Sequence, residues 1–63
     1  MPWSSVRYPV SMRHLEPWVR LKAIDIANAM LVAGTDEGRA IRIAIAKAKQ
    51  WAAREAETHA PPH

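Results

Sequence analysis

Apolar residues between positions 17 and 32 recur with the spacing of an amphipathic helix. Placed at 100° intervals, they fall on one broad face, while Lys22, Asp25 and Asn28 fall opposite. Pro17 suits a first helical position, and Gly34 follows the last apolar residue, where glycine commonly ends a helix. The pattern therefore predicts a helix over about 17–32, whose apolar face comprises Val19, Ala23, Ile24, Ile26, Ala27, Met30 and Leu31.

A second apolar stripe keeps its phase from Ala40 to Ala52 and predicts a helix over about 36–56. Thr35 supplies a hydroxyl for the N-cap, and Asp36 and Glu37 place negative charge at the positive end of the helix dipole. With only Gly34 and Thr35 left between them, the two helices must double back. The sequence thus predicts an all-α fold built on an antiparallel helical hairpin, with alanines from both helices at the contact.

The first fifteen residues predict an extended arm with room for one short helical turn. Pro2 and Pro9 disfavour a continuous helix there. The arm carries too many large apolar groups for a solvated tail, so we expect it to pack on the hairpin, with Trp3, Tyr8 and Leu15 near Trp51. Residues 1–57 then form one small helical domain, and the proline-containing segment 58–63 is predicted to be disordered.

Composition limits both the core and the chemistry. A chain of 63 residues holds one modest core, and it has no cysteine, which removes disulfides and thiolate metal sites. Two of its three histidines, His59 and His63, are four residues apart but fall in the proline-containing tail, so we expect neither metal nor cofactor. No apolar stretch approaches the roughly 20 residues that span a bilayer, and no secretory signal is evident, so we expect a cytoplasmic protein.

Catalytic patterns are weak. There is no glycine-rich phosphate loop and no pair of carboxylates on one face. Ser11 and His14 can meet across one helical turn, but a turn-forming serine and a solvated histidine explain the pair more simply. The sequence therefore predicts a protein that is not an enzyme.

Three segments carry a family resemblance: YPVSMRHL, IANAM and EGRAIRIAIAKAKQW. They resemble the small bacterial ChaB-like proteins and a related group of short stress-associated proteins that begin PW…YP, over most of Pro2 to Trp51. Ile45 stands where the ChaB pattern has tryptophan, which favours the related group. The resemblance implies a compact helical domain and a role in regulating cation transport or stress, but fold analogy alone is a weak guide to function.

Every charged residue from position 39 to position 54 is basic. These residues lie opposite the apolar stripe of the second predicted helix and comprise Arg39, Arg42, Lys47, Lys49 and Arg54. Such a face suits an acidic partner, or weak and non-specific nucleic-acid binding, and it also suits a helix face that is simply solvated. Sequence-specific DNA reading is disfavoured, because alanine and isoleucine stand where a recognition helix presents polar side chains.

Three apolar residues of the first predicted helix indicate association with protein. Leu21 and Val32 lie on its otherwise polar side, three turns apart and on one stripe, and Trp18 stands at its start. In a chain with a small core they are candidates for a homodimer contact or a partner groove. The sequence thus favours a non-enzymatic interaction or regulatory module, with weak nucleic-acid binding as the alternative.

Overall fold

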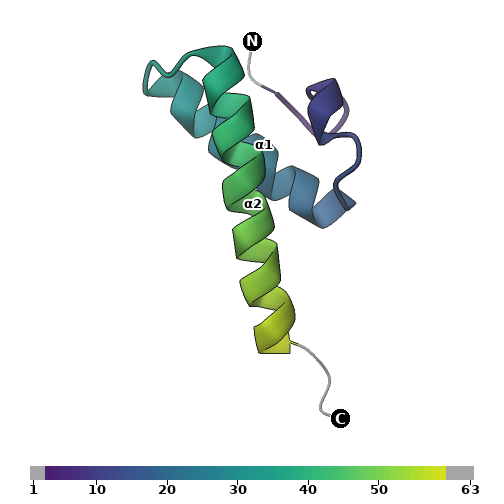
Figure 1. Ribbon diagram of the computed structural model, residues 1–63. Helices are drawn as coiled ribbons and strands as arrows, with labels where there is room; N and C mark the ends of the chain where they lie inside the picture. Colours follow the sequence, from purple (N-terminus) through teal and green to yellow (C-terminus); the bar gives the residue numbers. More distant parts are fainter. Residues whose placement is uncertain (1–2, 60–63) are drawn as a thin grey trace.

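Two long helices and one short turn make up the fold. The computed structural model describes residues 3–59, with the 3₁₀ turn η1 (Val10–Met12), then α1 (Pro17–Val32), then α2 (Glu37–His59). Figure 1 shows α2 crossing α1 obliquely, with the N-terminal arm folded back beside the pair. The described residues contain no strand. The predicted all-α hairpin with an N-terminal arm is therefore confirmed, and η1 is the short turn within that arm.

The turn after α1 is closed by a glycine in a left-handed conformation. Gly34 has φ +95°, which L-residues with a side chain rarely adopt. Its N–H donates to the carbonyl of Leu31 (3.0 Å), and the N–H of Thr35 donates to the carbonyl of Met30 (2.9 Å). This pair of bonds is the Schellman motif, which satisfies carbonyls left open at a helix end.

The helix α2 is capped by Asp36 rather than by the predicted Thr35. The Asp36 Oδ2 accepts from the N–H of Arg39 (3.3 Å), and its carbonyl accepts from the N–H of Ala40 (2.8 Å). Thr35 is still part of the motif that closes α1, so α2 begins one residue later than expected. The connection is consequently four residues, 33–36, where the sequence had indicated two.

Alanines form the contact between the two helices. They recur at four-residue intervals on each helix. Ridges formed by residues four apart interlock when two helices cross at an angle of about 50° in magnitude. The side chains are small, so the backbones can approach closely. All are fully buried: Ala23 and Ala27 from α1, and Ala40, Ala44 and Ala48 from α2.

Larger side chains from the arm complete the core. Met12 is fully buried and Leu15 nearly so, and both belong to the cluster that contains Val19 and Ile24 of α1. Trp3 and Tyr8 pack against this cluster from the arm. The arm therefore contributes to the core, as expected.

The expected position of Trp51 was wrong. Its ring lies 5.3 Å from that of Trp18, centroid to centroid, at an interplanar angle of 58°. Trp51 thus packs on the start of α1, while the arm covers another side of that helix.

The last turns of α2 extend past α1, with no other described element beside them in Figure 1. Because α2 continues to His59, the backbone at positions 58 and 59 is helical, although we had placed these residues in a disordered tail. The rest of that tail, 60–63, and the first two residues of the arm lie outside the described residues.

Candidate interaction surfaces

The arm is attached to α1 through a polar side chain. Asn28 Nδ2 donates to the carbonyl of Trp3 (2.9 Å), and Asn28 Oδ1 accepts from the N–H of Trp3 (2.8 Å). One amide group thus satisfies both main-chain groups of a residue 25 positions away. Asn28 was assigned to the solvent side of its helix, and this assignment was wrong, because the arm covers that position.

Arg20 makes a second attachment two turns earlier on α1. Its Nε donates to the carbonyl of Met12 (3.2 Å), and its Nη2 donates to those of Arg13 (3.2 Å) and Leu15 (2.9 Å). The guanidinium carbon also lies 4.5 Å from the centre of the Tyr8 ring, within the range of a cation–π contact. Arg20 was not among the residues singled out from the sequence. The available signal was its place between Val19 and Ala23, beside the apolar face.

A third side of α1 is exposed and mostly apolar. We call it the open face, and it comprises Trp18, Leu21, Asp25, Ala29 and Val32. The predicted interface residues all lie on it, with exposed fractions of 47% for Trp18, 53% for Leu21 and 90% for Val32. Asp25 is the one charged residue of the face. The structure therefore brings together the two residues that sequence spacing selected, Leu21 and Val32, and Trp18, which was selected for its place at the start of the helix.

Trp18 also links the open face to α2. Its ring packs on Trp51, and the ammonium of Lys22 lies 5.3 Å from the centre of the Trp51 ring. This small cluster fixes one end of the line along which the helices meet. About half of the Trp18 side chain is therefore packed against the protein, and the remaining surface faces solvent.

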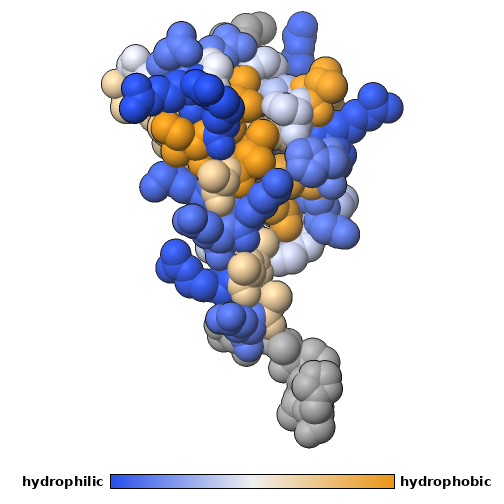
Figure 2. Space-filling view, viewed as in Figure 1, coloured by the Kyte–Doolittle hydropathy of each residue, from blue (hydrophilic) through white to orange (hydrophobic). Residues whose placement is uncertain are grey.

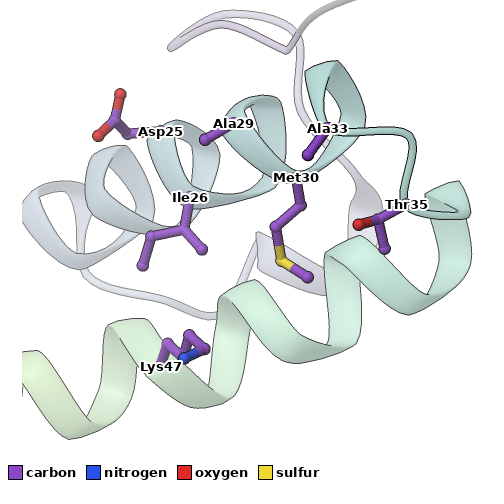
Figure 3. Close-up of a pocket in the computed structure, with 7 residues that line it drawn as sticks. All are labelled: Asp25, Ile26, Ala29, Met30, Ala33, Thr35 and Lys47. Atoms are coloured by element: carbon purple, nitrogen blue, oxygen red, sulfur yellow. The ribbon is translucent and has the colours of Figure 1, made fainter.

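A shallow groove of about 420 Å³ runs beside this line of contact. Its floor is apolar and comes from α1, and the opposite wall includes Lys47 of α2. Figure 3 shows Ile26 and Met30 directed toward α2 and Asp25 directed away from it. Its lining residues are Asp25, Ile26, Ala29, Met30, Ala33, Thr35 and Lys47.

The five candidate cations of α2 are all exposed, but they do not form one compact patch. Helical phase places Arg42 and Lys49 on one flank of α2, and Lys47 and Arg54 on the other. Arg39 lies between the two flanks. Figure 2 shows the result as blue side chains on either side of apolar ones along α2. The two flanks can therefore meet different partners.

The described residues provide little for catalysis or metal binding. No hydrogen bond joins Ser11 to His14 within residues 3–59. No group of three or more His, Cys, Asp or Glu side chains in this part of the chain is placed to hold a metal ion. Neither helix, over its described length, is long and apolar enough to cross a membrane. The surfaces above are thus the features from which a function can be argued.

One curated protein is similar in sequence. Uncharacterized protein YdaT of Bacillus subtilis (strain 168) is 64% identical over 52 residues, which are 82% of this chain and 35% of that protein. The chain thus spans about a third of the length of the relative it matches. No protein-family model matches the chain, so the resemblance to ChaB-like proteins stays a prediction. No solved structure matches it either.

Proposed function

We propose that this chain is a non-enzymatic helical module that binds another protein, or a second copy of itself, through the open face of α1. The observation that carries the proposal is the exposure of Trp18, Leu21 and Val32 on one side of one helix. The resemblance noted in the sequence favours a partner in stress response or cation transport.

The composition of α1 supports this assignment. A side of a helix that carries several aligned apolar residues is normally buried. Here the arm and α2 cover two sides, and the open face remains uncovered except where Trp18 meets Trp51. Scattered exposed apolar residues need no explanation, but an aligned set is typical of a binding surface.

A matched pair of valine substitutions tests the proposal. Val32 on the open face and Val10 on the arm are 90% and 80% exposed, so glutamate at either position should leave the fold intact. The 63-residue chain and both variants would be used to recover proteins from cells of the native organism, with light scattering to measure their mass. We expect Val32→Glu to lose the partner or the dimer and Val10→Glu to keep it. Equal behaviour of the two variants would contradict the proposal.

A second candidate function is weak, non-specific binding of nucleic acid by α2. The supporting observation is that Arg39, Arg42, Lys47 and Lys49 are exposed along a stretch without an acidic residue. Phosphate contacts of this kind weaken as the salt concentration rises, because the release of condensed counterions into a more concentrated solution is less favourable. Fluorescence anisotropy with a short DNA duplex at two salt concentrations tests it. The candidate predicts binding that is independent of sequence and lost at the higher salt, and no binding at low salt would exclude it.

A further inference from the structure

The groove beside the helix contact has room for side chains of a partner. Ile26 and Met30 form the apolar floor of the groove (Figure 3). Ala29 and Ala33 also line it, and their small side chains leave space within it. Its volume of about 420 Å³ lies within the range of about 300–1,000 Å³ typical of ligand sites. The groove can therefore accept apolar groups from outside.

The spacing of residues beside the groove suits a helix as the occupant. Trp18, Asp25 and Val32 recur every seven residues along α1, and Leu21 and Ala29 fall between them. One helix presents residues to another at this interval along a coiled coil. A helix laid in a groove is also a common mode of peptide recognition.

The charges around the groove are unequal on its two sides. Lys47 stands on the α2 wall. Asp25 is the acidic residue of the lining, and it points away from α2. A partner helix therefore meets the ammonium of Lys47 on its α2 side and should carry carboxylates on that side.

We propose that the groove binds an acidic amphipathic helix of another protein. Its apolar side chains lie over Ala29 and Ala33, and its carboxylates face Lys47. This inference rests on the proposed protein-binding function and names the chemistry of the partner. A second copy of the chain is the alternative occupant, and its dimerisation is one outcome of the test.

Two labelled peptides supply the probe. Both have the same leucine heptad pattern, and they carry either glutamate or glutamine at the flanking positions. Binding to the 63-residue chain is measured by fluorescence anisotropy at low and at physiological salt. We expect the glutamate peptide to bind at least about tenfold more tightly at low salt, because opposite charges meet across the contact.

Charge reversal on the two flanks of α2 separates a local contact from general attraction. Lys47→Glu and Arg42→Glu change the net charge equally, but only Lys47 lines the groove. We expect Lys47→Glu to remove most of the preference for the glutamate peptide and Arg42→Glu to preserve it. Ala29→Trp, at an exposed position, should block both peptides without unfolding the chain, as checked by circular dichroism.

Three results would overturn the inference: equal affinity for the two peptides, equal losses in the two charge-reversed variants, or a chain that dimerises and binds neither peptide. In the last case Val32→Glu would still abolish dimerisation if the proposed function is right, so the two failures can be told apart.

Discussion

The closed and open sides of α1 differ in how their polar groups are used. On the side covered by the arm, Asn28 and Arg20 donate to main-chain carbonyls of the arm, and Asn28 also accepts a main-chain N–H. On the open face, Leu21 and Val32 are exposed. Polar side chains thus add main-chain hydrogen bonds to the apolar packing of the covered side, while apolar residues lie in solvent on the other.

The fully buried side chains among the described residues are all apolar, so this contrast concerns the margins of the core, where half-buried polar side chains hold the arm and some aliphatic side chains stay exposed. A short chain has few large apolar residues for its core. Hydrogen bonds to the arm backbone help to cover one side of α1, and aliphatic residues remain for another. Stability and recognition should therefore depend on different residues of the same helix.

The largest effect is expected where the arm enters the core. Met12 is fully buried, and Met12→Ala should lower the free energy of unfolding by about 2–4 kcal/mol, since buried methionine truncations leave a cavity. Chemical denaturation followed by tryptophan fluorescence would measure it. A loss below about 1 kcal/mol would mean that the arm does not contribute to the cooperative core.

Asn28→Ala should have the next largest effect. It leaves the N–H and carbonyl of Trp3 without their partner, which costs about 1–3 kcal/mol for buried groups and less where water can enter. Val32→Ala, one turn later on the open face, is the control and should change stability by less than about 0.5 kcal/mol. Similar losses in the two variants would remove the contrast between the sides.

Arg20→Lys should cost about 1 kcal/mol, less than Asn28→Ala, although the charge is kept. Lysine lacks the planar fork that reaches three carbonyls, and it stacks less well on Tyr8. Thermal melts at low and high salt would show whether geometry or charge matters. A fully stable lysine variant would indicate that charge alone holds the arm.

The smallest effect is expected at the indole of Trp3. Its Nε1 is buried and finds no acceptor among the described residues. Trp3→Phe removes this unpaired donor together with some packing area, so the two effects oppose each other and the net change should stay within about 1 kcal/mol. Denaturant titration beside Asn28→Ala measures it, and a loss as large as that of Asn28→Ala would show that the indole donor is satisfied.

The hairpin could be predicted because its signals are local. The phase of the apolar residues and the position of Gly34 located both helices and the turn. The cap moved from Thr35 to Asp36 because two end motifs share one short connection, and sequence alone does not divide them. Errors of one residue at helix ends are common for this reason.

The attachments of the arm could not be predicted, because they join residues distant in the chain. Asn28 counts as polar in any helical pattern, and only the fold brings the main chain of Trp3 to it. Trp51 was expected beside the arm, but the antiparallel path of the two helices places it beside Trp18. Of the candidate site, the exposure of Leu21 and Val32 followed from spacing, whereas the groove did not.

Asn28 bonds to the main-chain N–H and carbonyl of Trp3, and the side chain of Trp3 takes no part in these bonds. The two positions should therefore diverge at unequal rates in evolution. Many residue types at position 3 still offer an N–H and a carbonyl, and proline alone lacks the donor. Few side chains other than asparagine offer a donor and an acceptor at that distance from the helix. Substitutions should therefore be tolerated at position 3 and selected against at position 28.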